Sequence, residues 1–348
     1  MTELARSELA PGYSVAQVIN GCWQLTPDHG SGPTSEKCIL RRFAELVDHG
    51  FTTFDCADIY EGTEELLGKF RRSLKDPSSI QVHTKFVPDK GALAELDDET
   101  IDAVIDRSRK RLGVATLDLV QFHWWNYEAP GLERLYDRLL QAQSAGKIRF
   151  LGVTNFNTKH LEKLIDQSTA IISMQAQYSL LDRRPERRMT GVCSEHGVAL
   201  LTYGVLAGGF LTRKYLGRPE PETMNRSLMK YRLIIDEIGG WPALQNLLEQ
   251  LADIAEKHGT EIDTIAARWV LDQPAVKAII LGIGSRSRAR QNLALSRIEL
   301  EDSDRKVIAR RLQSLGIPAG DPYDLERDPD SIHARIIRTD LQKARASR

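Results

Sequence analysis

Cysteine is scarce in this sequence, and its placement argues against disulfides and against a metal site. Only four of the 348 residues are cysteines, namely Cys22, Cys38, Cys56 and Cys193. They lie far apart, form no Cys-x-x-Cys pair and have no metal-ligand spacing beside a histidine. Such spacing is typical of reduced intracellular thiols. We therefore expect neither a bound metal nor a disulfide framework.

Long apolar runs and an excess of charge of one sign are also missing. No apolar stretch approaches the ~18 residues that span a bilayer, and residues 1–6 show no apolar signal segment. Lysine and arginine number 47 against 48 for aspartate and glutamate, which gives a formal net charge of −1. Nucleic-acid and membrane-surface binding normally need a basic footprint. We expect a cytoplasmic protein with neither kind of partner.

Short apolar strands alternate with amphipathic helices along the chain. Apolar residues make up 41% of the sequence, and its length suffices for one α/β barrel of about 250 residues with insertions. Strands are expected at residues 15–25, 51–55, 80–86, 117–123, 148–154, 171–177, 198–205 and 276–283. Helices are expected at residues 35–49, 64–73, 97–112, 132–145, 158–166, 185–196, 227–238, 242–258, 263–272 and 302–315, with a further helix starting at Ser285.

This alternation implies parallel strands joined by right-handed crossovers. A closed (β/α)8 TIM barrel and a doubly wound open sheet both satisfy it, but no Gly-x-Gly-x-x-Gly follows the first strand. The polar residues described next all fall at the C-terminal ends of strands, which converge on one face only when the sheet closes. We predict a TIM barrel over residues 1–315 as a single domain, with a long loop after the seventh strand and a C-terminal tail at residues 316–348. Residues 316–329 of this tail are rich in proline, glycine and aspartate and are expected to form a loop.

Three strand ends carry groups suited to carbonyl reduction. Asp55 ends one strand and is followed by Tyr60, while Lys85 and His123 end two others. A hydride that arrives at a carbonyl carbon leaves negative charge on oxygen, which a proton or fixed donors must meet. Tyrosine is a poor acid near neutral pH because its pKa is about 10. A nearby ammonium lowers that pKa, a carboxylate holds the ammonium in place, and a histidine can donate to the carbonyl oxygen.

These residues stand in motifs that resemble those of the aldo-keto reductase superfamily over nearly the whole chain. The motifs are Asp55-x-Ala57-x-x-Tyr60-x-Gly62, Thr84-Lys85, residues 117–123, residues 146–149 with 152–156, and residues 175–178. Residues 203–206 and 211–215 are similar to the branch of the potassium-channel β subunits and the bacterial aldo/keto reductases. The resemblance implies an oxidoreductase that interconverts an aldehyde or ketone and its alcohol. Tyr60 would be the general acid and base, next to Asp55, Lys85 and His123.

Hydride chemistry requires a cofactor, because side chains alone cannot supply it. The resemblance implies a nicotinamide dinucleotide whose carboxamide is held by Thr154, Asn155 and Gln175, whose ring stacks on Tyr203, and whose diphosphate is reached by Lys214. The full set of expected cofactor-binding residues is Gly21, Cys22, Trp23, Asp55, Thr154, Asn155, Gln175, Tyr203, Gly204, Leu206, Lys214, Gly282, Gly284, Arg288, Gln291 and Asn292. Without the family, these would be interpreted as loop caps, core residues or, around Arg288, a solvated basic helix face.

The identity of the dinucleotide is less sharply indicated than its presence. Arg288 favours NADP(H), since a guanidinium suits a 2′-phosphate. Gly284 stands where the family usually has a polar or basic side chain, so NAD(H) stays open. Likewise, Gly204 and Val205 replace a common Ser-Pro pair, and Met174 replaces a common asparagine.

Aromatic residues are expected to wall the substrate pocket. The candidates are Trp23, Trp124, Trp125 and Tyr127, because adjacent tryptophans after a catalytic strand end are hard to bury together. One of Trp124 and Trp125 can instead pack under the following loop. In the family, the counterpart of residues 206–241 covers the cofactor. The tail has a weak apolar stripe of Ile332, Ile336, Ile337 and Leu341, and three roles are open for it, over the pocket, against another subunit, or mobile.

Two other functions, a regulatory subunit and a hydrolase, compete with the reductase. The same barrel serves as a partner-binding, cofactor-sensing module in the channel-associated relatives, although the intact set of four residues disfavours pure regulation. A hydrolase that uses Asp55 and His123 would leave Lys85 and Tyr60 unexplained. The sequence predicts a small-molecule carbonyl or alcohol as the partner, and it leaves the substrate, the direction of reaction and the oligomeric state open.

Overall fold

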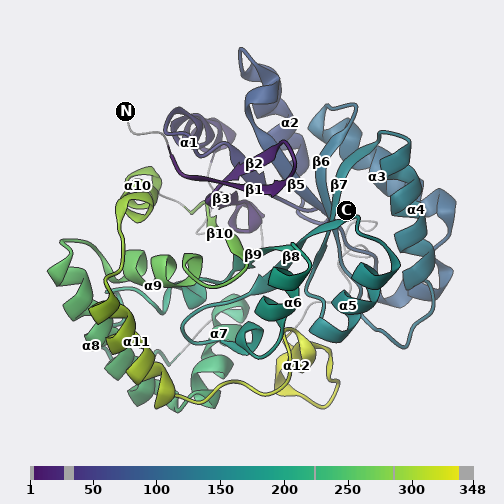
Figure 1. Cartoon of the computed structure of the whole chain (residues 1–348). Coiled ribbons are helices and arrows are strands. Elements are labelled where there is room, and N and C mark those ends of the chain that lie inside the picture. The colour runs from purple at the N-terminus through teal and green to yellow at the C-terminus, as the bar shows by residue number, and fades with distance from the viewer. Residues whose placement is uncertain (1–3, 27–34, 223–224, 285–286, 337–348) are drawn as a thin grey trace.

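The chain forms a closed barrel of eight parallel strands surrounded by helices (Figure 1). The structure is a computed structural model, and it describes residues 4–26, 35–222, 225–284 and 287–336. The strands follow one another around the barrel in chain order, and β10 closes it against β3. They are β3 (Val18–Gly21), β4 (Thr53–Asp55), β5 (Gln81–Phe86), β6 (Leu117–Phe122), β7 (Ile148–Thr154), β8 (Ile171–Gln177), β9 (Ala199–Tyr203) and β10 (Val276–Gly282). The TIM-barrel prediction is confirmed.

Helices pack around the barrel between successive strands (Figure 1). They are α1 (Glu36–Asp48), α2 (Thr63–Ser73), α3 (Asp98–Leu112), α4 (Leu132–Ser144), α5 (Thr158–Gln167), α6 (Met189–Glu195), α7 (Arg226–Glu237), α8 (Gly240–Lys257), α9 (Ile262–Leu271), α10 (Ala289–Arg297) and α11 (Asp302–Gln313). Local chemistry sets many of their ends. In α3, for example, the Asp97 side chain accepts from the amide of Thr100 at the start, and Gly113 ends the helix at a φ of 68°.

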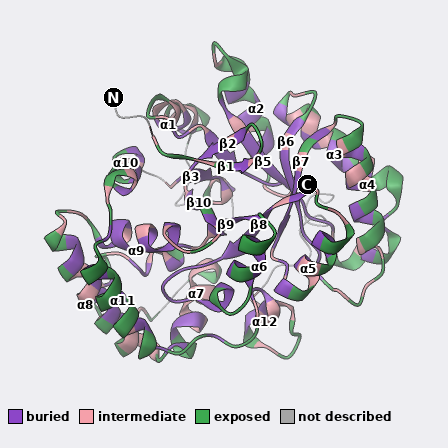
Figure 2. Cartoon of the chain, viewed as in Figure 1, coloured by how far each residue is buried: buried purple, intermediate pink, exposed green. Residues whose placement is uncertain are grey.

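The core has two parts, one inside the barrel and one between the barrel and its helices. Figure 2 shows the strands and the inner helix faces buried and the outer helix faces exposed. Inside the barrel, Leu119, Leu201 and Ile280 pack together. A larger cluster lies outside the strands, where alternate strand residues meet the apolar stripes of the helices.

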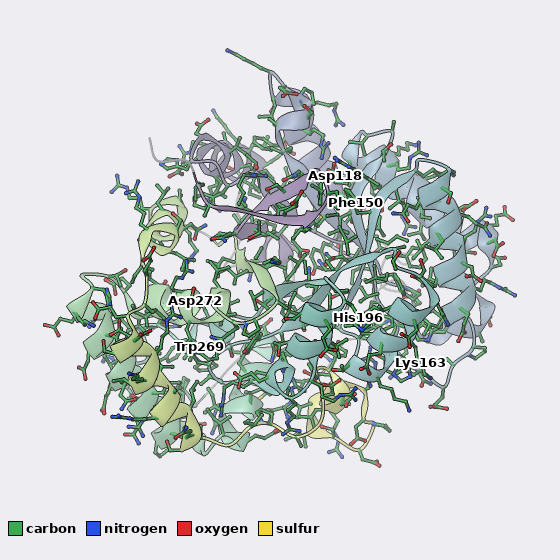
Figure 3. The ribbon with its side chains drawn as sticks, viewed as in Figure 1. Asp118, Phe150, Lys163, His196, Trp269 and Asp272 are labelled. Carbon is green, nitrogen blue, oxygen red and sulfur yellow. The ribbon has the colours of Figure 1, made fainter. Side chains whose placement is uncertain are left out.

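An antiparallel hairpin that the sequence did not predict packs at the N-terminal end of the barrel. Its strands are β1 (Arg6–Ala10) and β2 (Tyr13–Ala16). The Tyr13 ring lies 4.6 Å from that of Phe150, which Figure 3 labels beside the hairpin. The single strand predicted at residues 15–25 is wrong: the chain turns at Gly12, pairs β2 with β1, and only then enters the barrel as β3. The apolar residues of β2 misled the prediction because they are buried against the interior of the barrel.

Two other boundaries differ from the predictions. The helix expected at residues 185–196 is divided into a 3-10 turn at Arg184–Glu186 and α6, because Arg188 has a non-helical backbone conformation. The helix expected from Ser285 begins at Ala289, and residues 285–286 lie outside the described chain.

The C-terminal segment folds back onto the barrel. It contains two short helices, α12 (Asp324–Arg327) and α13 (Ile332–Arg335), the first of which lies within the loop expected at residues 316–329. The predicted apolar stripe is wrong for Ile332, which is 54% exposed, because its neighbour His333 faces inward and bonds to Glu237 of α7. Ile337 and Leu341 lie outside the described residues.

The described residues contain neither a helix that could span a membrane nor a cluster that could hold a metal ion. None of the helices there is both long enough and apolar enough to cross a membrane. The same residues contain no cluster of three or more histidine, cysteine, aspartate or glutamate side chains arranged to hold a metal ion.

Candidate active site

The register of the neighbouring strands β4 and β5 brings a carboxylate and an ammonium together at the C-terminal mouth of the barrel. Asp55 of β4 pairs with His83 of β5, and Lys85 is two residues further along the same strand. The Lys85 ammonium donates to Asp55 Oδ2 at 2.6 Å and to the carbonyl of Cys56 at 2.8 Å. Both side chains are 6% exposed. The expected carboxylate–ammonium pair is therefore present and is almost fully buried from solvent.

The other oxygen of Asp55 is held by amide groups. Gln175 Nε2 donates to Asp55 Oδ1 at 2.7 Å, and Gln121 Nε2 lies 3.4 Å from the same atom. Gln175 Nε2 also lies 3.3 Å from Gln121 Oε1. A carboxylate that accepts hydrogen bonds at both of its oxygens is fixed in orientation. Gln175 therefore supports the acid of the site as well as facing the cavity.

Tyr60 follows β4 by one turn and stands against the same group. Its ring centroid lies 5.3 Å from Lys85 Nζ and 4.9 Å from the Trp23 ring. Burial, followed by the charge of Asp55, raises the pKa of Tyr60 well above 10. The expectation that Lys85 lowers this pKa is not met, because burial and the charge of Asp55 raise it instead. Tyr60 is a phenol at neutral pH, which is the form that can give a proton to a carbonyl oxygen.

His123 directly follows β6, and its backbone amide donates to the carbonyl of Phe86 on the neighbouring strand β5. Its Nδ1 lies 3.1 Å from the carbonyl oxygen of Thr154, so Nδ1 carries the proton. Nε2 is buried and bonds to none of the described residues. Burial and the charge of Arg327 lower the pKa of His123 to about 3. The ring is therefore neutral, and it presents a lone pair at Nε2.

These four side chains line one cavity of about 530 Å³. Nine of the expected cofactor residues line it too, namely Gly21, Trp23, Asp55, Thr154, Asn155, Gln175, Tyr203, Gly204 and Gly282. Asn155 adopts a left-handed backbone with a φ of 60°, which is uncommon for any residue but glycine. Its Oδ1 accepts a 2.8 Å hydrogen bond from the Tyr203 hydroxyl. The sequence motifs thus converge in space as expected.

The remaining expected cofactor residues do not line this cavity. They are Cys22, Leu206, Lys214, Gly284, Arg288, Gln291 and Asn292. Arg288 Nη2 bonds to Asp263 at 2.7 Å, and the Lys214 ammonium lies 4.7 Å over the Tyr215 ring. Asn292 is buried, and its Oδ1 has no partner among the described residues.

The aromatic wall is only partly as predicted. Trp23 and Trp125 line the cavity, and the Trp125 ring stands edge-on to His123 at 4.3 Å. Trp124 does not line the cavity, because it points to the other side of the chain and is fully buried. Tyr127 is also absent from the wall, since its ring stacks on His160 at 3.5 Å and its hydroxyl accepts from the amide of Asn157.

Several residues of the cavity were not predicted from the sequence. Those nearest to the four side chains are Ile59 and Val87. Others come from distant segments and close the cavity from above, namely Asn225, Arg226, Ser227, Lys230 and Tyr231 of the α7 region and Tyr323 and Ile336 of the C-terminal segment. The Tyr323 ring lies 5.5 Å from that of His123. No local signal marks these residues, apart from the length of the connection after β9.

Comparisons with known proteins agree with this geometry. The chain is 32% identical over 273 residues to the chloroplastic pyridoxal reductase of Arabidopsis thaliana, which covers 73% of this chain and 71% of that protein. It is 27% identical over 236 residues to the NADH-specific methylglyoxal reductase of Escherichia coli, with 66% and 69% covered. It is also 27% identical to flagellar radial spoke protein 5 of Chlamydomonas reinhardtii, where the match covers 67% of this chain and 56% of that protein.

The structural comparison points the same way. The thermostable aldo-keto reductase Tm1743, solved with the inhibitor epalrestat, superposes with a TM-score of 0.71 at 25% identity, over 88% of this chain and 100% of that one. The model of the Aldo/keto reductase family matches residues 17–311. Together with the barrel and the four side chains at its mouth, this match shows that the chain belongs to the aldo/keto reductase family and is an oxidoreductase.

Proposed function

We propose that the protein interconverts an aldehyde or ketone and its alcohol by hydride transfer with a nicotinamide dinucleotide, with Tyr60 as the general acid and base. The observation that carries this proposal is the meeting of Tyr60, Lys85, Asp55 and His123 in one cavity. The intact set favours turnover over a purely regulatory role. Tyr60 holds the proton, and the Lys85–Asp55 pair places a fixed charge beside the oxygen on which negative charge develops.

The hydrogen-bonding groups of the cavity fit a nicotinamide carboxamide. Asn155 Oδ1 is occupied by Tyr203, which leaves its Nδ2 as a donor. The two hydrogens of Gln175 Nε2 are directed to Asp55 and Gln121, which leaves Oε1 as an acceptor. One free donor and one free acceptor are what a primary amide needs. Bound there, the dinucleotide would supply or accept the hydride.

Glycines make room for such a cofactor beside these groups. Gly204 has a φ of 68°, and a Cβ there would lie 2.9 Å from the Tyr231 hydroxyl. Gly21 and Gly282 line the same wall. Small residues allow the backbone to approach a ligand closely. The stacking partner of the ring would be Tyr203, which the family resemblance implied.

The tautomer of His123 assigns it a state-dependent role. With Nδ1 bonded to the Thr154 carbonyl, the neutral ring can only accept at Nε2, so it suits an alcohol hydroxyl. A carbonyl oxygen needs a donor, which Nε2 becomes only in the imidazolium form. Because burial and the charge of Arg327 lower the pKa of His123 to about 3, that form is scarce near neutral pH. We propose that His123 accepts from the bound alcohol and that the Tyr60 hydroxyl donates to the carbonyl oxygen. This refines the expectation that His123 simply donates.

NADP(H) is our favoured dinucleotide, with NAD(H) as the alternative. Arg288 supports NADP(H), although its guanidinium is paired with Asp263 and must be shared with a 2′-phosphate. The printed name of the NADH-specific relative from Escherichia coli supports the alternative. Titrations of both reduced cofactors, followed by their fluorescence, decide between them. Preference for NADH would exclude Arg288 as a 2′-phosphate site.

Replacement of the phenol tests the catalytic proposal. We expect Tyr60→Phe to lower kcat/KM for aldehydes about 10²–10⁴-fold, the usual contribution of a general acid, while NADPH binding persists. Tyr136→Phe is a matched control, since the Tyr136 hydroxyl is buried on α4 and does not line the cavity. Wild-type turnover by Tyr60→Phe would refute the assignment. Absence of cofactor binding in the wild-type protein would refute the redox function itself.

A further inference from the structure

Lys230 is a partly buried cation in the cavity that the proposed reaction itself does not use. It lies on α7, and its side chain is 16% exposed. The ammonium lies 5.3 Å from the Tyr203 ring centroid and 5.6 Å from that of Tyr323. Both rings line the cavity. Lys230 therefore lies near both Tyr203, the expected stacking partner of the nicotinamide ring, and Tyr323, whose ring contacts His123.

The hydrogen-bonding capacity of this ammonium is largely unused by the described residues. The Tyr203 hydroxyl lies 3.5 Å away, at the limit of a hydrogen bond. The nearest acid, Glu326, is 3.7 Å away, which is an ion pair without a hydrogen bond. An ammonium has three N–H donors and no acceptor. A lysine that is mostly out of water and keeps donors toward a cavity is suited to bind a ligand.

Glu326 does not neutralise Lys230 alone, because it already serves another cation. Both of its carboxylate oxygens accept from Arg184, at 3.0 and 3.1 Å. Arg184 in turn bonds twice to Asp182, at 2.7 and 2.9 Å. Glu326 therefore fixes Lys230 in place while its own lone pairs point to Arg184. The charge of Lys230 is directed at the cavity.

The wall that contains Lys230 carries no acid. The single carboxylate that lines the cavity, within the described chain, is Asp55, and Lys85 pairs with it. On the α7 side the lining side chains are Asn225, Arg226, Ser227, Lys230 and Tyr231. Among the side chains that line the cavity, charge is therefore balanced at the catalytic end, whereas Arg226 and Lys230 are cations at the α7 end. An anionic oxygen group complements such a wall.

The spacing between the two ends suits a compact substrate. The His123 and Tyr323 rings are 5.5 Å apart, and Lys230 Nζ lies 5.6 Å from the Tyr323 ring, so the ammonium is at most 11.1 Å from the His123 ring. Trp23, Trp125 and Tyr323 line the space with aromatic surface. A carbonyl compound with an aromatic or short aliphatic body can span this distance.

We propose that Lys230 binds the anionic group of the substrate, and that the enzyme prefers aldehydes or ketones which carry a carboxylate or phosphate at the end remote from the carbonyl. This inference rests on the proposed function. The same chemistry could come from the cofactor diphosphate, so the test must separate the two sources. In both cases the ligand contributes anionic oxygens and the protein an ammonium.

The test compares 4-carboxybenzaldehyde with benzaldehyde, which lacks the para carboxylate and its negative charge. We expect the wild-type enzyme to show the higher kcat/KM for the carboxylate, and Lys230→Met to reduce the ratio of the two values about 10- to 100-fold, as for loss of a charged hydrogen bond. Lys230→Arg should restore most of the ratio. Lys163→Met is the control, because Lys163 is exposed on the outer face of α5, where Figure 3 labels it.

The outcomes separate this inference from the function on which it rests. A wild-type enzyme that reduces benzaldehyde as well as its carboxylate, with inhibition by benzoate no stronger than by benzamide, overturns the substrate class and leaves the reductase intact. An unchanged ratio in Lys230→Met together with a raised Kd for NADPH assigns the ammonium to the cofactor and overturns it too. If no aldehyde supports NADPH oxidation, the proposed function fails first. The wild-type comparisons keep the test valid should Lys230→Met not fold.

Discussion

The buried ion network beneath the C-terminal segment provides the most quantitative prediction. Arg184 bonds to Asp182 and Glu326, and all three side chains are 1% exposed. Burial raises the pKa of Glu326, but the charges of Arg184 and Lys230 outweigh it and bring the value to about 2. The carboxylate is therefore ionised in the folded protein at neutral pH. Removal of the guanidinium would leave two buried carboxylates without their main partner.

We expect Arg184→Met to lower the free energy of unfolding by about 3–5 kcal/mol, the usual cost when one member of a buried ion pair is lost. Glu326→Gln should cost less, because Arg184 keeps Asp182. A double-mutant cycle of the two should give a coupling free energy of at least about 1.5 kcal/mol, since neighbours in one network are not additive. Urea unfolding measures all of these values, with the slope checked for constancy.

A neighbouring arginine supplies the control. Arg188 pairs with Glu162 at 2.7 Å, but the Arg188 side chain is 62% exposed. Exposed pairs contribute about 0–1 kcal/mol, so Arg188→Met should be nearly neutral. Should Arg184→Met prove equally mild, the network would not hold the segment, and the placement of Tyr323 over His123 would need another cause. Limited proteolysis after Leu315 reports whether the segment detaches first.

Two further predictions concern acid stability and the packing of α7. Burial lowers the pKa of His83 to about 3, so the folded state resists a proton that the unfolded chain accepts below about 6.5. Stability is therefore present above pH 6.5 and lost toward pH 3, by about 2–3 kcal/mol at pH 4.5, and His83→Gln should flatten the profile of unfolding free energy against pH. Gly204→Ala should destabilise more than Gly217→Ala, because both positions have a φ near 68° but only the first Cβ would meet Tyr231. Equal melting temperatures of the two variants would remove the contact with α7 from the explanation.

The parts of the site that the sequence predicted are those set by local rules. Asp55, Lys85 and His123 end apolar strands, and parallel strands bring their ends to one edge. Their meeting therefore needs only the count and direction of the strands. Such rules could not assign the roles of Trp124 and Trp125. Adjacent residues at a strand end face opposite sides, and which side is the cavity depends on β6 and its register with β7.

The missed parts are set by contacts between distant segments. Arg184 and Glu326 are 142 positions apart, and no periodicity connects them. Their bond places α12 in a stretch whose glycines and prolines indicated a loop. The left-handed backbone of Tyr323, with a φ of 64°, is likewise a product of tertiary structure. Desolvation also reversed the expected direction of the Tyr60 pKa shift, because sequence shows neighbours in the chain but not burial.

The proposed hydride chemistry and the proposed substrate selectivity depend on different regions of the chain. The family match ends at residue 311, so Tyr323, which contacts His123, comes from outside the part shared with the family model. The proposed reacting groups lie at or after the ends of β4, β5 and β6, whereas Lys230 and Tyr323 reach the cavity from α7 and the C-terminal segment. Glu326 of α12 forms an ion pair with Lys230 of α7, so we expect substitutions there to shift both walls together. Relatives can thus keep Tyr60 and Lys85 unchanged while the ends of the cavity choose different carbonyl compounds.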